Sequence, residues 1–347
     1  MLRRALAQLT RKQRAVIVPR FREHLTEAAV TALAVTTAGA VAVWPHPAGI
    51  VATQGQDMPD LRGKVGAIRY AYQTPCEVDE MTRRSDRSAV EWRVVTQKGT
   101  YRLPQALTSS KKDPRVPVAI SRDGRRLAYY SRDAGAHVIR DMAGGEEVVS
   151  PVKEAEERIG AGSMLVISDD GRYLAFDPRE GSKDPGLLID VRTGTRSIPG
   201  VYEVVGIKDG AASLVRYRKT DLWVTPVTGG GKPVRFDGVF IMFSELAPDG
   251  RTVVAVEFDE LEPGRLTLLD ARTGRTLRKV SMRGLPPGDQ IDGTGIWLSR
   301  DEVTVIAGSR ELVAYALDVT TGRTRRLASY GNERRSLTLP GVNRAFR

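Results

Sequence analysis

The chain repeats one hydrophobic pattern three times: a short alternation of apolar and polar residues, a turn built on Asp-Gly, and a second alternation. Alternation with a period of two is typical of a β-strand, and Asp-Gly supplies the positive backbone φ angles that a tight hairpin turn needs. Each copy therefore predicts a β-hairpin. The copies cover residues 119–130, 166–176 and 246–256.

A second pattern alternates with the first, an apolar strand that ends in Asp and is followed by a turn containing Gly. It covers residues 187–196, 266–275 and 313–323. The spacing of the copies corresponds to units of about 40–45 residues, with one degenerate unit in residues 201–238. The six units that result begin near residues 62, 115, 156, 201, 239 and 289.

Units of this length are typical of four-stranded propeller blades, whereas a sandwich of two sheets needs no such period. We predict an all-β fold: a β-propeller of about six four-stranded blades, preceded by a short α-helical N-terminal segment. The predicted boundaries are a helical segment at 1–44, a linker at 45–61, the propeller at 62–331 and a basic C-terminal tail at 332–347.

The repeat resembles those of TolB-type and WD40-like propellers, in which Ser-Pro-Asp-Gly-Arg precedes a Leu-Ala-aromatic strand and an Asp-x-x-x-Gly turn. Its best copy is Ala-Pro-Asp-Gly-Arg at residues 247–251. The chain contains no Trp-Asp and no Gly-His dipeptide, so the TolB-like branch fits better than the true WD40 repeat. The resemblance covers about residues 62–331 and implies a fold rather than a ligand.

Residues 9–40 resemble region 4 of extracytoplasmic-function sigma factors. The matching positions are Leu9, Gln13, Arg14, Val16, Arg20, Phe21, Leu25, Thr26 and Glu27. The match fails at residues 35–44, where a recognition helix needs polar and basic side chains, and Pro19 interrupts the first helix. This resemblance implies a regulator associated with DNA or RNA polymerase, with an N-terminal helix-turn-helix and a sensory propeller.

The same region also supports a membrane anchor. Residues 28–43 are mostly Ala and Val, and His46 is the only ionisable residue between Ala28 and Gln56. The basic residues before this segment obey the positive-inside rule, and Trp44 suits a membrane interface. This interpretation places the propeller outside the cytoplasm, with the basic N-terminus on an anionic membrane. A third interpretation is a buried helix that packs on the propeller or on a partner.

The propeller differs in net charge from the two ends of the chain. The net charge of +11 comes from the basic ends, while the propeller is balanced. A neutral propeller argues against a nucleic-acid footprint on its surface, which requires clustered positive charge. Cys76 is the only cysteine, so the chain has no internal disulfide.

No motif predicts catalysis. The histidines are His24, His46 and His137, and the chain has no Gly-x-Ser-x-Gly sequence. We expect His137 to face a strand edge or a loop. The repeated aspartates are predicted to bond the turn backbone two residues on rather than to bind calcium. We predict no catalytic, cofactor or metal site.

Other candidate features receive structural interpretations. The Gly-rich segments at 141–145 and 229–232 are predicted hairpin turns, because neither precedes a helix with Lys-Ser/Thr. Trp92, Trp223 and Trp297 are expected to pack between blades. The acidic residues Asp259, Glu260 and Glu262 are expected in a solvated loop, and the insertions at 177–186 and 257–264 rim one face, where propellers usually hold partners.

The favoured interpretation is a non-enzymatic propeller that binds a protein or a small ligand on one face or in its channel, tethered to a membrane or associated with the cell envelope. The alternative is the sigma-like regulator, for which nucleic acid or RNA polymerase is the partner. An enzyme that uses His137 is the weakest of the three. Which residues bind the ligand is not predicted.

Overall fold

The structure is a computed structural model that divides into two compact units, Met1–Met58 and Pro59–Arg347. It describes residues 58–75, 77–78, 85–86, 90–110, 115–160, 162–178, 186–198, 203–216, 220–258, 264–309, 311–331 and 335–342. The predicted N-terminal helix, the sigma-like segment and the candidate membrane anchor lie outside these residues. Within them, no helix has the length and apolar character needed to span a membrane.

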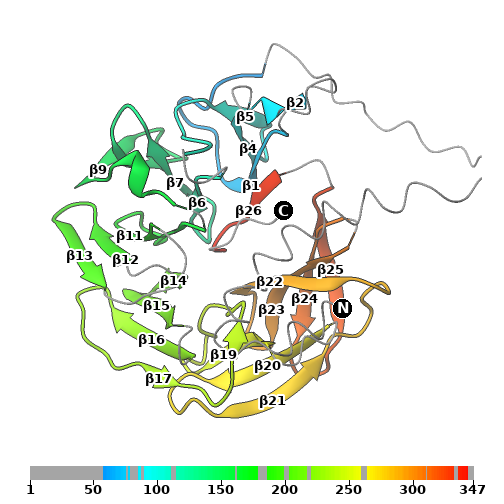
Figure 1. Cartoon of the computed structure of the whole chain (residues 1–347). Coiled ribbons are helices and arrows are strands. Elements are labelled where there is room, and N and C mark those ends of the chain that lie inside the picture. The colour runs from blue at the N-terminus through cyan, green and yellow to red at the C-terminus, as the bar shows by residue number, and fades with distance from the viewer. Residues whose placement is uncertain are drawn as a thin grey trace, which may run out of the picture. The chain divides into compact units, whose positions relative to one another are not determined.

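Six four-stranded antiparallel sheets form a ring, which confirms the predicted six-bladed propeller (Figure 1). In blade 1 the strands run outward from the axis as β26 (Arg335–Thr338), β1 (Ile68–Gln73), β4 (Trp92–Thr96) and β5 (Thr100–Leu103). Blade 2 contains β6 (Ala119–Ile120), β7 (Arg126–Ser131), β8 (Ala136–Asp141) and β9 (Glu147–Lys153). Blade 3 contains β10 (Met164–Ile167), β11 (Tyr173–Asp177), β12 (Gly186–Asp190) and β13 (Gly194–Ile198).

The degenerate repeat forms blade 4, with β14 (Glu203–Lys208), β15 (Ala211–Arg216), β16 (Asp221–Pro226) and β17 (Val234–Arg235). Blade 5 contains β18 (Phe240–Ile241), β19 (Thr252–Glu257), β20 (Arg265–Asp270) and β21 (Thr276–Ser281). Blade 6 contains β22 (Gln290–Trp297), β23 (Glu302–Gly308), β24 (Val313–Asp318) and β25 (Thr324–Ser329). A small hairpin of β2 (Glu77–Val78) and β3 (Ser85–Asp86) and a 3₁₀ turn at Glu156–Arg158 complete the described elements.

The ring is closed by a strand from near the C-terminus. β26 pairs with β1, so that Ala71 lies opposite Thr338 and Gln73 opposite Arg335. The Ser336 hydroxyl donates to Gln73 Oε1 at 2.9 Å, inside the closed sheet. Residues 335–338 therefore belong to blade 1 and not to a tail outside the repeats, which corrects the predicted boundary.

The predicted linker also ends earlier than expected. Asp60 forms a parallel bridge with Arg102 of β5, and the Leu61 N–H donates to the Arg102 carbonyl at 2.7 Å. Leu61 is buried. The propeller thus begins near residue 59, because this segment adds an edge to blade 1 before the first repeat starts.

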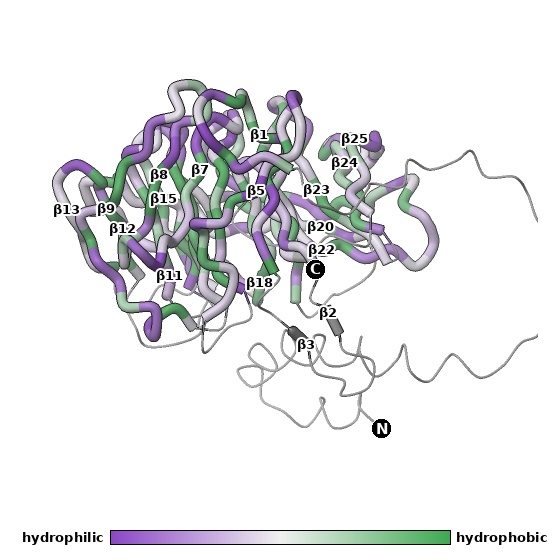
Figure 2. Tube along the Cα trace, turned by 90° about the horizontal axis from the view of Figure 1, so that it is seen from above, coloured by the Kyte–Doolittle hydropathy of each residue, from purple (hydrophilic) through white to green (hydrophobic). Residues whose placement is uncertain are grey.

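Each blade buries both faces against its neighbours. Among the described residues, six hydrophobic clusters fill the six junctions between adjacent blades. In β7, Leu127 and Tyr129 pack with blade 1, whereas Ala128 and Tyr130 pack with blade 3. Burial on both faces explains why the middle strands are almost continuously apolar. Figure 2 shows hydrophobic segments along the strands and hydrophilic segments at many of the turns.

Candidate functional site

The Asp-Gly turns are held by their own aspartates. Asp123, Asp170 and Asp249 each accept a hydrogen bond from the backbone N–H two residues on, at 2.9, 3.0 and 2.8 Å. These bonds confirm the predicted turn role. Among the described residues, no group of three or more His, Cys, Asp or Glu side chains is placed to hold a metal ion.

An arginine after each of these turns pairs with the aspartate that ends the third strand of the same blade. The pairs are Arg126 with Asp141 at 2.5 Å, Arg172 with Asp190 at 2.7 Å and Arg251 with Asp270 at 2.6 Å. The hydrogen bond from Arg172 lowers the pKa of Asp190 to about 2, and the Arg251 guanidinium likewise holds the pKa of Asp270 well below its usual range. The first sequence pattern thus supplies the arginine and the second supplies the aspartate of one ion pair in each of these three blades. We call this ion pair the ionic clamp of the blade.

His137 lies in the core and not at a strand edge or loop, which corrects the expectation from the sequence. It is 1% exposed in β8, with its ring 5.6 Å from that of Tyr130 and 4.5 Å from that of Phe176. Loss of hydration lowers the pKa of His137 to about 4, so the imidazole is neutral near pH 7. A substrate outside the core does not reach this ring.

The predicted turns and tryptophans have the expected structural roles. Asp141 accepts hydrogen bonds from the N–H groups of Ala143 and Gly144, and this turn joins β8 to β9. Trp92 and Trp297 are buried in two of the junction clusters. Trp223 of β16 donates to the Gly230 carbonyl at 3.2 Å, across the second Gly-rich turn. The acidic residues 259, 260 and 262 lie outside the described part of the chain.

Charged side chains from several blades meet near the axis, on the side of the Asp-Gly turns. Arg122 of blade 2 pairs with Glu245 of blade 5, with 3.1 Å between Nη2 and Oε1. The Trp297 N–H of blade 6 donates to the same oxygen at 2.9 Å, and the Arg122 N–H donates to Asp169 of blade 3 at 2.9 Å. Blades 2 and 5 are opposite in the ring, so this ion pair bridges the axis (Figure 1).

Within the axial cluster, Glu245 is buried, Arg122 is partly exposed and Asp169 is exposed. The Glu245 side chain is 7% exposed, and burial raises its pKa. Gly341, which follows β26, donates its N–H to the Ile120 carbonyl at 2.9 Å and packs against the stem of Arg122.

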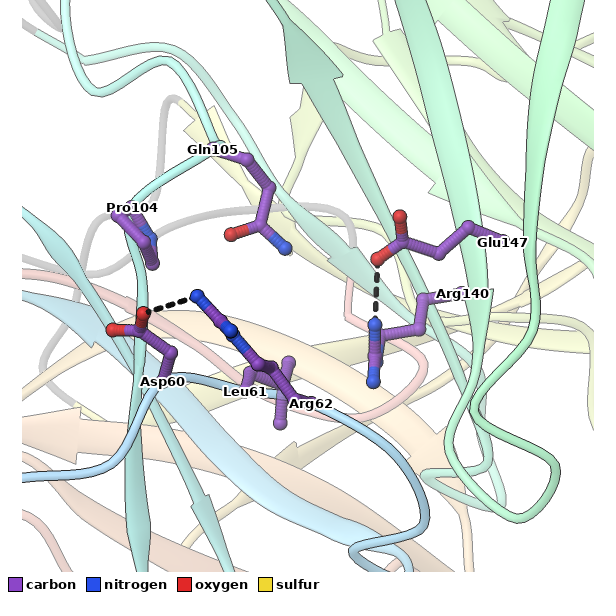
Figure 3. A pocket seen from close by; sticks show the side chains of 7 residues that line it. All are labelled: Asp60, Leu61, Arg62, Pro104, Gln105, Arg140 and Glu147. Atoms are coloured by element: carbon purple, nitrogen blue, oxygen red, sulfur yellow. Dashed lines mark hydrogen bonds and ion pairs between the residues drawn. The ribbon is translucent and has the colours of Figure 1, made fainter.

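A separate pocket of about 290 Å³ lies at the junction of blades 1 and 2 (Figure 3). Its walls come from three places: the segment before β1, the end of β5, and the β8–β9 hairpin. The lining residues are Asp60, Leu61, Arg62, Pro104, Gln105, Arg140 and Glu147. The volume is just below the usual range of about 300–1,000 Å³ for small-ligand pockets.

Two ion pairs face each other across this pocket. Arg62 pairs with Asp60 at 3.2 Å on one side, and Arg140 pairs with Glu147 at 2.6 Å on the other (Figure 3). The Arg140 side chain is only 5% exposed, and its Nη2 also donates to the Gly63 carbonyl at 3.0 Å. Arg140 is therefore held in one position before any ligand arrives.

Tyr129 and Gln105 extend the polar wall behind Glu147. The Tyr129 hydroxyl donates to Glu147 Oε1 at 3.2 Å, and burial raises the pKa of this tyrosine. Gln105 also hydrogen-bonds to Tyr129. The pocket therefore offers carboxylate oxygens as acceptors, and guanidinium and amide groups as donors, within one small volume.

Sequence reasoning missed both polar sites. Arg122 and Glu245 are 123 positions apart and share no motif, and the pocket joins Asp60 to Glu147 only because blades 1 and 2 pack side by side. One signal was available: Arg122 and Asp169 occupy the same place in the turns of blades 2 and 3, immediately before the Asp-Gly aspartate. In the structure these two positions are in contact, since the Arg122 N–H donates to Asp169.

No protein-family model matches the sequence, and a search of curated proteins finds no match. Solved structures do match. TolB from Acinetobacter baumannii is 17% identical with a TM-score of 0.50, over 78% of this chain and 66% of that chain. A putative TolB from Agrobacterium tumefaciens is 16% identical with a TM-score of 0.47, over 77% of this chain and 91% of that chain.

The dihydro-heme d1 dehydrogenase NirN, in complex with DHE, is 15% identical with a TM-score of 0.43, over 84% of this chain and 58% of that chain. This chain thus spans less than two thirds of the length of NirN and of the Acinetobacter TolB. The likeness to that TolB agrees with the resemblance of the repeats and shows a TolB-like propeller fold. The sigma-factor resemblance of residues 9–40 finds no support in these comparisons.

Proposed function

We propose that this chain is a non-enzymatic propeller that binds a small ligand or a protein partner and acts at the cell envelope. The observation that carries the proposal is the preformed pocket between blades 1 and 2, in which Arg140 and Glu147 are fixed by contacts inside the protein. Preorganised polar groups around a small cavity favour binding, because little conformational entropy is lost when the ligand arrives.

The chemistry of the pocket favours binding over catalysis. A general base needs a pKa near the working pH, and a nucleophile needs an adjacent base. The pocket is lined by four charged residues in two ion pairs, a glutamine, a leucine and a proline, without an imidazole or a thiol. The histidine in the described part of the chain, His137, is enclosed by aromatic rings.

The binding proposal is tested by exposing the purified chain to a metabolite extract and identifying what it retains. We expect a small molecule to be recovered with its mass unchanged and to be displaced by an excess of the same compound. Recovery of a chemically altered product indicates an enzyme, and retention of nothing removes the small-ligand form of the proposal.

The envelope location rests on the apolar run at residues 28–43 and on the basic residues that precede it. Membrane fractionation with protease accessibility, on a chain tagged at its C-terminus, tests it. A chain in the membrane pellet, with its propeller protected until the envelope is opened, supports the anchor. A chain only in the cytosolic fraction contradicts it and makes RNA polymerase pull-down the next experiment, because residues 9–40 resemble region 4 of a sigma factor.

A further inference from the structure

We propose that the pocket between blades 1 and 2 takes a small neutral polyhydroxylated molecule, of the size of a monosaccharide. This inference rests on the proposed binding function and names the ligand class. It follows from three properties of the lining residues: their charge balance, their mixture of donors and acceptors, and the size of the cavity.

Charge balance argues against an ionic ligand. Arg62 and Asp60 form one pair and Arg140 and Glu147 form the other, so the walls carry no net charge. An anionic ligand would be repelled by the carboxylates of Asp60 and Glu147, and a cationic ligand by the guanidinium groups of Arg62 and Arg140. A charged ligand would also have to be removed from water without a free counter-charge to replace its hydration, which is costly.

The polar edges of the pocket require a ligand that both donates and accepts hydrogen bonds. Asp60 and Glu147 offer oxygens that only accept, while Arg62 and Arg140 offer N–H groups that only donate. Gln105, on the wall between the two pairs, offers both kinds of group (Figure 3). A hydroxyl group is both donor and acceptor, so several hydroxyl groups on one small frame satisfy the two sets together.

The size and the charged lining residues of the pocket favour a small polar ligand. A pocket of about 290 Å³ lies just below the usual range of about 300–1,000 Å³ for drug-sized ligands, so its size favours a smaller molecule. Among the described residues that line it, only Leu61 and Pro104 have apolar side chains. An apolar ligand would bury the ion pairs without replacing the water bonded to them.

Saturation-transfer NMR on the full chain tests this assignment, with glucose, galactose, N-acetylglucosamine and myo-inositol as neutral probes. Glucuronate and glucosamine are the matched charged probes. We expect at least one neutral probe to bind about tenfold more tightly than its charged analogue. Equal or tighter binding of the charged analogues, or no binding of any neutral probe, overturns the assignment.

Variants show whether binding occurs in this pocket. Arg62→Ala removes a side chain that is 84% exposed, so the fold should persist, and we expect the bound probe to lose affinity about tenfold. Arg69→Ala, on the exposed side of β1, is the matched control. Gln105→Leu, with Gln290→Leu as its control, repeats the comparison for the amide. Unchanged affinity in both Arg62→Ala and Gln105→Leu overturns the assignment of the site.

The outcomes also separate this inference from the proposed function. If no sugar binds while the metabolite extract yields a ligand of another class, the binding function stands and the ligand class is wrong. If neither experiment yields a ligand, the small-ligand form of the proposed function fails as well.

Discussion

His137 shows how burial on both faces of a blade controls the charge of a single residue. Its pKa is lowered by burial from 6.5 to about 4 in the folded chain, whereas the unfolded chain takes up the proton near the ordinary value. The contribution of this group to stability is therefore present above pH 6.5 and is lost as the pH falls towards 4, by about 3 kcal/mol in all.

We expect His137→Leu to remove this pH dependence, because leucine fills the site without a titratable group. The measurement is the free energy of unfolding by denaturant at several pH values between 7 and 4, for both chains. An equally steep decline in His137→Leu would assign the pH dependence to other residues.

Gly274 illustrates a second constraint at the scale of one residue. Its φ is +75°, and a Cβ atom there would lie 1.9 Å from the Arg235 carbonyl oxygen of blade 4. We expect Gly274→Ala to cost about 3 kcal/mol or more, the sum of a left-handed backbone and a backbone clash. Gly288→Ala is the control, since Gly288 has a φ of +89° with nothing near its Cβ position, and it should cost only about 1–2 kcal/mol. Equal losses of stability in thermal unfolding would show that the clash is relieved by movement of the turn.

Among the elements, the ionic clamps tie the first turn of a blade to the end of its third strand. Asp270 is 2% exposed and accepts bonds from Arg251 and from the N–H groups of Arg272 and Thr273. Arg251→Ala leaves a buried carboxylate with fewer donors, so we expect a loss of about 1–3 kcal/mol in the free energy of unfolding. The exposed Arg272→Ala is the control. A double-mutant cycle with Asp270→Asn should show coupling, and strictly additive losses would mean that the clamp contributes nothing.

The clamps also show what the sequence predicts and what it does not. Asp-Gly turns and strands of period two are local signals, so blade number and most strands follow from them. The partner of Arg172 is 18 positions away, across two more strands, and depends on the register of the sheet. The sequence of β26, Arg-Ser-Leu-Thr, carries no repeat signal, and its pairing with β1 is known only from the closed ring.

The pocket and the axial ion pair are harder to predict from the sequence than the clamps are. The pocket depends on how two blades pack, and the axial pair depends on how opposite blades are spaced. Neither distance is encoded in a local pattern. The sequence therefore predicts that the chain binds a partner, but it does not predict where the binding site lies.

For the whole molecule, ring closure depends on few residues. Leu337 of β26 is fully buried in the cluster between blades 6 and 1. We expect Leu337→Ala to cost about 2–5 kcal/mol, the usual cost of a cavity in a well-packed core. The control is Leu327→Ala on β25, where the leucine is 40% exposed and should cost little. Thermal unfolding of both variants gives the comparison, and similar small losses would show that the ring is stable without a well-packed closing strand.

The place of β26 in the chain also sets the order in which the molecule is completed during its synthesis. Blade 1 leaves the ribosome before the other blades, yet its innermost strand is made only after blades 2–6. Until then, the inner edge of β1 presents unpaired N–H and C=O groups, which are a template for a strand from another chain. A chain truncated before residue 335 would therefore keep this edge of β1 without its partner strand.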